Sequence, residues 1–254
     1  MDTKQILKQI EKCECIKILA AIEVGSRAFG YETNKSDYDI RFIYIRPIHW
    51  YLSLEVKSDT LEITKGDYDL VGWDIKKVLT LLKSSNPNLM EWLSSDIIYQ
   101  DNNLLESLRG LYMDYYTKKK CLYHYLSMAR KNYMNYFKPE FVVKKLFYIL
   151  RPLLCCDYIL IYEDFPSLNL NILINYLDLD QGLKNEIIQL IELRKQDKST
   201  TQLVYWPYIK DYIEKKIVLL DELIKDINQE AKLNDYKTID AYFYKLLIIN
   251  NVEY

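Results

Sequence analysis

Over the first hundred positions of the chain, short apolar runs alternate with turn residues. Such runs are typical of strands, whereas apolar residues at three- and four-residue spacing are typical of helices. The Asp74 side chain can cap a helix that follows it. Asn86-Pro87 should end that helix or begin the next turn, because the residue before proline avoids the helical region. The pattern predicts strands at residues 16–24, 38–45, 60–64 and 68–71, and helices at residues 3–12, after Asp74, and at 88–93 leading to 97–99.

Beyond residue 100 the helical spacing dominates, and Pro139, Pro166, Gly182 and Pro207 interrupt it. No internal repeat and no low-complexity linker interrupts the chain. We therefore expect an α+β organisation, with a catalytic domain at residues 1–100 and a helical domain at residues 101–254. The predicted helices cover residues 102–116, 118–136, 141–161, 183–194, 207–228 and 238–249.

Charge and cysteine content narrow the classes of function. Lys and Arg total 34 against 36 Asp and Glu, a net charge of −2, which gives no support for tight non-specific nucleic-acid binding over the whole surface. A local basic groove remains compatible with that balance. The five cysteines form no C-x-x-C pair and the chain has two histidines, so a Cys/His zinc site is not expected. The absence of a signal-peptide pattern and of a membrane-length apolar run predicts a cytoplasmic protein with reduced thiols.

The stretch that carries chemistry runs from Val24 to Ile40. Gly25 permits a tight turn after a strand, and Ser26 can cap the short helix that follows, whose N–H groups suit phosphate oxygens. Asp37 and Asp39 stand two apart at the start of a strand, so both carboxylates point to one face. Two like charges side by side call for a cation such as Mg²⁺. An Asp-x-Asp alone is more often a solvated strand face, and only the combination in this order indicates a site.

That order of strand, Gly-Ser turn, short helix and Asp-x-Asp strand closely resembles the DNA polymerase β superfamily. The lines GSRAFGYETNKSDYDIRFIYIRPIHWYLSL, DLVGWDIKK, SSNPNLMEWL, HYLSMARKNY and KLFYILRPLL further resemble the RlaP-type predicted nucleotidyltransferases, some encoded beside RNA-repair ligases. The resemblance extends from about Val24 to Leu154 and fades beyond. It implies a polymerase-β-like nucleotidyltransferase fold with a mixed sheet and flanking helices, followed by an all-helical C-terminal part.

The resemblance also implies a catalytic set. Superfamily members carry a third carboxylate on a later strand, and Asp69 matches that position, with Asp67 of the same parity as the alternative. Asp37, Asp39 and Asp69 would then bind two Mg²⁺ ions, or Mn²⁺, and act in catalysis. The competing interpretation makes Asp67 and Asp69 the polar face of an edge strand.

Three basic residues and the Gly-Ser turn complete the predicted nucleotide site. Gly25 and Ser26 would contact phosphate oxygens, and Arg27 could reach a triphosphate or form a surface salt bridge. Arg41 shares the face of Asp37 and Asp39, and either neutralises that cluster or contacts phosphate. Lys77, on the helix after Asp74, is a candidate phosphate ligand, although a solvated helix face is the more common role for such a lysine.

These residues predict transfer of a nucleoside monophosphate from an NTP to an acceptor hydroxyl, with release of pyrophosphate. The resemblance points to an RNA or tRNA end as acceptor. A protein or small-molecule hydroxyl is the alternative, and a catalytically silent NTP-binding module is a third. His124 is expected to be structural. Groups available to an RNA acceptor in the helical part are Arg130, Lys131, Lys144, Lys145, Arg151, Tyr123, Tyr125 and Tyr133.

Overall fold

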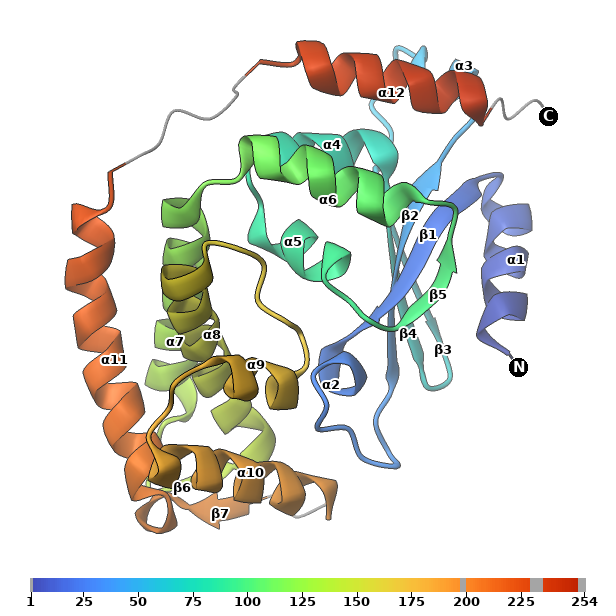
Figure 1. The fold of residues 1–254 in the computed structure, drawn as a ribbon. Coiled ribbons are helices and arrows are strands. Elements are labelled where there is room, and N and C mark those ends of the chain that lie inside the picture. Colours follow the sequence, from blue (N-terminus) through green and yellow to red (C-terminus); the bar gives the residue numbers. More distant parts are fainter. Residues whose placement is uncertain (1, 197–199, 229–234, 251–254) are drawn as a thin grey trace. The chain divides into compact units, whose positions relative to one another are not determined.

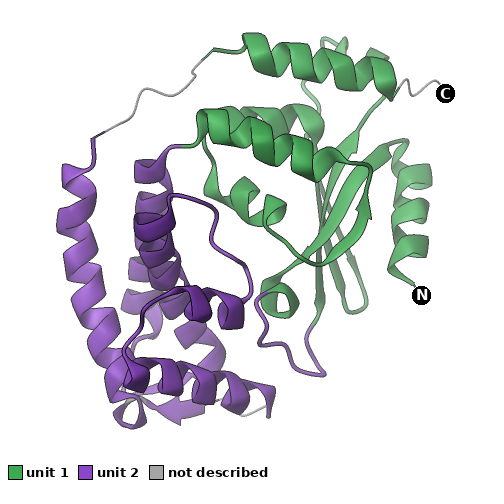
Figure 2. Ribbon diagram, viewed as in Figure 1, with its two compact units in different colours: residues 1–28, 37–116, 231–254 green, residues 29–36, 117–230 purple. Residues whose placement is uncertain are grey.

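The computed structural model describes residues 2–196, 200–228 and 235–250, and these form two compact units. Unit 1 contains residues 1–28, 37–116 and 231–254, and unit 2 contains residues 29–36 and 117–230 (Figure 2). The chain therefore passes between the units four times. Each unit has its own core.

A five-stranded mixed sheet forms the centre of unit 1, with strand order β3-β4-β2-β1-β5. β2 and β4 pair in parallel, and the other neighbours pair antiparallel. The strands are β1 (Lys17–Val24), β2 (Tyr38–Ile45), β3 (Thr60–Lys65), β4 (Tyr68–Asp74) and β5 (Ile98–Asp101). The mixed sheet confirms the predicted fold class.

Helices cover both faces of this sheet (Figure 1). On one face, Ile6, Leu7 and Ile10 of α1 pack into a core with Ile40 and Leu70. Trp73 has the opposite strand parity to Leu70, and its ring stacks on Trp92 of α5 with 3.6 Å between centroids. The helices of unit 1 are α1 (Thr3–Glu14), α2 (Gly25–Ala28), α3 (Ile48–Tyr51), α4 (Ile75–Lys83), α5 (Pro87–Leu93), α6 (Leu104–Tyr115) and α12 (Lys237–Ile249).

Among the described residues of unit 2, the regular structure is helical apart from one short antiparallel pairing of two strands. α7 and α8 pack along each other, and α9, α10 and α11 each contact one or both of them. The pairing of β6 with β7, which join residues far apart in sequence, was not predicted, because three-residue strands carry no readable alternation. The elements are α7 (Lys118–Tyr136), β6 (Glu140–Val142), α8 (Val143–Tyr162), α9 (Leu170–Tyr176), α10 (Gln181–Lys195), β7 (Thr200–Gln202), η1 (Leu203–Tyr205) and α11 (Pro207–Asp226).

Residues 29–36, which connect α2 to the Asp-x-Asp strand, belong to unit 2. The Tyr31 ring is buried and stacks on Phe147 of α8 with 4.3 Å between centroids. The N–H of Leu170 donates to the Phe29 carbonyl at 3.0 Å, and Gly30 has the Asn169 side chain against its Cα. The helical unit thus anchors the segment between Ser26 and Asp37.

The compact units do not divide at residue 100. α6 belongs to unit 1, where Tyr112 is buried and its hydroxyl donates to the Asn86 carbonyl at 3.2 Å. α12 belongs there as well: Tyr242 shares a 2.6 Å hydrogen bond with Ser107, and Phe243 meets the Tyr51 ring edge-on. Helical periodicity shows that a helix has a buried face, but it does not identify the core in which that face is buried. No helix among the described residues has both the length and the apolarity needed to cross a bilayer.

Candidate active site

The Gly-Ser turn places the backbone at the end of β1 against the side chain of Asp39 on β2. Gly25 has φ +67°, a left-handed conformation, and a Cβ at this position would lie 1.9 Å from Oδ2 of Asp39. Val24 and Asp39 are register partners in the β1–β2 pair. Ser26 is buried in the first turn of α2. Glycine is required here because any side chain would occupy the position of the Asp39 carboxylate.

Asp39 and Asp69 lie side by side on adjacent strands. They are register partners in the parallel β2–β4 pair, so their side chains project from the same face of the sheet. Their side chains are 29 % and 47 % exposed, which leaves both carboxylates accessible. Between them lies the Arg41 guanidinium, with Nη2 at 3.1 Å from Oδ2 of Asp69 and 3.8 Å from Oδ1 of Asp39. The pair therefore already accommodates one cationic group.

The remaining acidic candidates, Asp37 and Asp67, lie just before the strands that carry Asp39 and Asp69. Asp37 is exposed immediately before β2, and its carbonyl accepts a 3.2 Å hydrogen bond from Nε of Arg27. The Arg27 guanidinium also lies 3.9 Å above the Tyr38 ring. Asp67 is exposed in the turn before β4, and its carbonyl accepts the N–H of Tyr38. Asp67 thus precedes the strand, whereas Asp69 is placed in register with Asp39.

The chemistry of this donor set fits a hard divalent cation. Among the described residues, no three His, Cys, Asp or Glu side chains are grouped closely enough to hold a metal ion together. Asp39 and Asp69 nevertheless offer carboxylate oxygens to a shared cation, and Mg²⁺ is commonly bound by one or two carboxylates together with water and substrate phosphate. Asp37 has the strand parity of Asp39 and is the third available carboxylate.

A buried carboxylate stands directly behind Asp39. Glu23 is fully buried; its Oε1 accepts the backbone N–H of Asp39 at 2.8 Å, and its Oε2 accepts the Tyr99 hydroxyl at 2.6 Å. Burial raises the pKa of the Glu23 carboxyl above its ordinary value. Sequence reasoning missed both residues, although a charged residue inside the apolar run of β1 is itself a signal, because an acidic side chain is rarely buried without partners.

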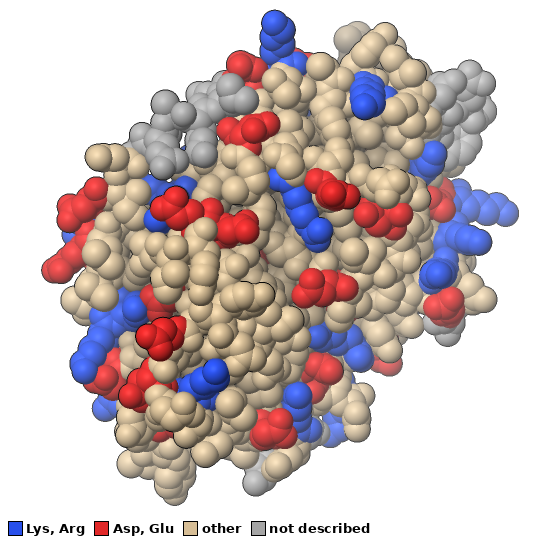
Figure 3. All heavy atoms as spheres, viewed as in Figure 1, with Lys and Arg blue, Asp and Glu red and all other residues tan. Residues whose placement is uncertain are grey.

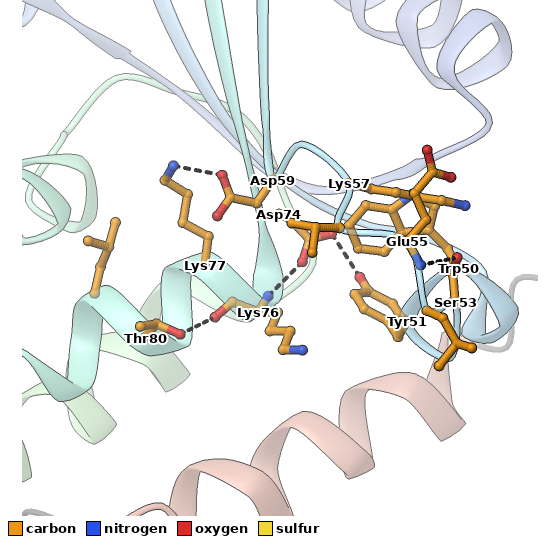
Figure 4. A pocket seen from close by; sticks show the side chains of 13 residues that line it. Trp50, Tyr51, Ser53, Glu55, Lys57, Asp59, Asp74, Lys76, Lys77 and Thr80 are labelled. Atoms are coloured by element: carbon orange, nitrogen blue, oxygen red, sulfur yellow. Dashed lines mark hydrogen bonds and ion pairs between the residues drawn. The ribbon is translucent and has the colours of Figure 1, made fainter.

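Lys77 lies apart from the aspartate pair. Its ammonium donates to Asp59 Oδ1 at 2.8 Å (Figure 4) and to the Thr60 hydroxyl at 2.7 Å. Both partners lie next to the opposite end of β4 from Asp69. A pocket of about 540 Å³ opens there, bounded by α3, the loop after it and the start of α4. Asp74 caps α4 at this end, as expected, by accepting the Lys76 N–H. The structure therefore does not bring Lys77 together with the other candidate residues.

Several groups assigned to an RNA acceptor are engaged or buried within unit 2. Arg130 pairs with Asp221, Arg151 is buried with its guanidinium over the Phe29 ring, and Tyr125 is fully buried. Arg151 and Tyr125 therefore serve the core of unit 2, and neither can contact RNA. Lys131, Lys144 and Tyr123 remain exposed, and acidic and basic side chains are interspersed over the face in Figure 3.

Three comparisons place the chain among known proteins. The model of the RNA repair pathway DNA polymerase beta family, RlaP, matches residues 2–245. YcgL of Bacillus subtilis (strain 168), an uncharacterized protein, is 38 % identical over 229 residues, covering 89 % of this chain and 88 % of YcgL. A crystal structure of a nucleotidyltransferase-like protein from Exiguobacterium sibiricum 255-15 is 16 % identical with a TM-score of 0.31, covering 88 % of this chain and 75 % of that one. That structural likeness is too loose to inform on individual residues. The match over nearly the whole chain shows that the protein belongs to the RlaP family of polymerase-β-like nucleotidyltransferases.

Proposed function

We propose that this protein transfers a nucleoside monophosphate from an NTP to an acceptor hydroxyl, in a reaction that depends on Mg²⁺ or Mn²⁺. The observation that carries the proposal is the Asp39–Asp69 pair, in register on parallel strands with the Gly25 backbone beneath Asp39. Nucleotidyltransferase-like family membership supports the reaction class. The order of motifs along the chain would not by itself support the proposal without this juxtaposition of carboxylates.

In the proposed reaction an acceptor oxygen forms a bond to the α-phosphorus of the NTP. The bond from that phosphorus to the bridging oxygen breaks, pyrophosphate leaves, and the hydroxyl proton passes to solvent. Asp39 and Asp69, with Asp37, would hold divalent cations, which when bound lower the pKa of the hydroxyl and offset charge on the phosphates. The protein's own contribution is to fix the carboxylates beside the phosphate-binding turn, so that little reorganisation is needed during the reaction.

The basic groups near the pair have separable roles in this proposal. Ser26 and the N–H groups of α2 bind phosphate oxygens, as a turn with successive free N–H groups does. Arg27, on the last position but one of α2, extends over Tyr38 and lies next to Asp37. Arg41 offsets the negative charge of Asp39 and Asp69, and its guanidinium would be available to contact a phosphate oxygen once these carboxylates held a divalent cation.

An RNA end is the proposed acceptor, supported by the description of the family as an RNA repair pathway family. The net charge of −2 and the engagement of Arg130 and Arg151 argue against a long duplex, which needs many phosphate contacts. A short single-stranded end requires fewer contacts with the protein.

The test incubates the protein with each α-³²P-labelled NTP, Mg²⁺ or Mn²⁺, and total RNA. Label is expected on RNA for the wild type and to be reduced by about three orders of magnitude in Asp39→Asn, since a lost ligand forfeits several kcal/mol of transition-state stabilisation. Label on protein or on a small molecule would move the acceptor to that class. Undiminished transfer by Asp39→Asn would overturn the assignment of the site.

A further inference from the structure

We infer that Glu23 is a positioning residue of the transfer site, which holds the backbone of Asp39 in place from the buried side of the sheet. This inference rests on the proposed function and names a residue of that same site. Glu23 contacts no substrate in this scheme. It acts through Asp39, and Tyr99 acts through Glu23.

The first argument is the hydrogen bond itself. Asp39 lies opposite Val24, the last residue of β1, yet its N–H donates to the side chain of Glu23 at 2.8 Å. Hydrogen bonds to a charged acceptor are stronger than bonds between neutral groups. The start of β2 is therefore fastened to the end of β1 by a side chain at the point where the Gly-Ser turn begins.

Further hydrogen bonds hold both the backbone and the side chain of Glu23. Its N–H donates to the Ile97 carbonyl at 2.9 Å, and its carbonyl accepts the Ser95 hydroxyl at 2.5 Å. Tyr99 of β5 donates to the second carboxylate oxygen at 2.6 Å. Residues of three strands thus meet at this carboxylate, and the Asp39 N–H links it directly to the site.

The hydrogen bond between the Asp39 N–H and Glu23 matters for the site because the Asp39 carboxylate has little space around it. The Asp39 carboxylate is bounded below by the Gly25 backbone, and beside it by Arg41 and Asp69. If the Asp39 N–H loses this acceptor, the backbone at Asp39 is held less tightly, and the Asp39 carboxylate can shift relative to that of Asp69. Partners behind a metal ligand typically change metal affinity or activity by about 10- to 100-fold when they are removed.

The chain offers a matched control at the opposite end of β4. Asp74 is also fully buried, accepts one backbone N–H from Lys76 at 2.8 Å, and accepts one tyrosine hydroxyl, from Tyr51 at 2.9 Å. Burial raises the pKa of Asp74 to about 6, so both carboxylates experience the same kind of environment. Only Glu23 bonds a residue of the candidate site.

The experiment compares Glu23→Met, which keeps length but removes the acceptor, with Glu23→Gln, which retains it, and with Asp74→Leu as the control. Thermal unfolding is measured first, followed by Mn²⁺ binding by electron paramagnetic resonance and amide hydrogen exchange of the peptide containing Asp39. Glu23→Met is expected to weaken Mn²⁺ binding about 10- to 100-fold and to speed Asp39 exchange. Glu23→Gln should restore both, and Asp74→Leu should lower stability while leaving both near the wild-type values.

Equal Mn²⁺ affinity and exchange in wild type and folded Glu23→Met would overturn the inference, as would an equal loss in Asp74→Leu. If Glu23→Met does not fold, Tyr99→Phe decides, because it removes one hydroxyl and keeps the ring. Faster exchange at Asp39 is then expected, and unchanged exchange overturns the inference. A wild type that binds Mn²⁺ but transfers no label refutes the proposed reaction alone, since neither readout for Glu23 requires turnover.

Discussion

Replacing Gly25 by alanine tests the geometry of the site most directly. The new Cβ would lie 1.9 Å from Oδ2 and 2.6 Å from Cγ of Asp39, distances that non-bonded atoms do not adopt. The carboxylate must therefore move by about 1 Å, and a misplacement of that size costs on the order of 100-fold in rate. The left-handed backbone, with φ +67°, adds about 1–2 kcal/mol of strain for a residue with a Cβ.

Gly66 supplies the control for the strain. It has φ +58°, also left-handed, but a Cβ there would meet nothing within 4 Å. Gly66→Ala should therefore lose a similar 1–2 kcal/mol of stability and keep its transfer rate. Urea unfolding gives the stability of each variant, and Mn²⁺ binding and the labelled-NTP assay give the state of the site. If Gly25→Ala transferred label as fast as Gly66→Ala, the crowding argument at Asp39 would be refuted.

Two further predictions concern the other acidic residues. Asp69→Asn should reduce transfer by about two to three orders of magnitude, whereas Asp67→Asn should change it little, because only Asp69 is in register with Asp39; equal effects in the labelled-NTP assay would return both to a polar strand edge. For Asp74, burial raises the folded-state pKa to about 6 from the ordinary 3.8, so the folded protein binds the proton more tightly than the unfolded chain. Its stabilising effect is therefore complete below pH 4 and is lost as the pH rises to 6. Urea unfolding should show wild type losing up to about 3 kcal/mol relative to Asp74→Asn over that interval, and a constant difference would contradict this.

The sequence predicted those parts of the site that depend on local spacing. Alternation along β2 placed Asp37, Asp39 and Arg41 on one face, and the turn chemistry of Gly25 placed a close approach there. The choice of Asp69 as the third carboxylate came from the family resemblance. Its place beside Asp39 depends on the parallel register of β2 and β4, which periodicity does not predict.

Other features were beyond local reasoning because they depend on contacts between distant segments. Lys77 was assigned to the nucleotide site from its charge, but the strand length of β4 separates it from Asp69. The hydrogen bond between Tyr99 and Glu23 depends on the pairing of β5 with β1, which local sequence patterns do not predict. The membership of α12 in unit 1 likewise depends on its contacts with α4, which is distant in sequence.

The interleaving of the two units has a consequence for how the protein is made. Residues 29–36 leave the ribosome early, but their partners Phe147 and Leu170 are synthesised more than a hundred residues later. In the same way the sheet is complete by residue 101, while α12, which packs on α4, follows the whole of unit 2. Neither unit can reach its final form before the other has been largely translated. A fragment ending at residue 116 would lack both α12 and the residues that anchor the segment before Asp37. The two units must therefore complete their folding together, late in synthesis.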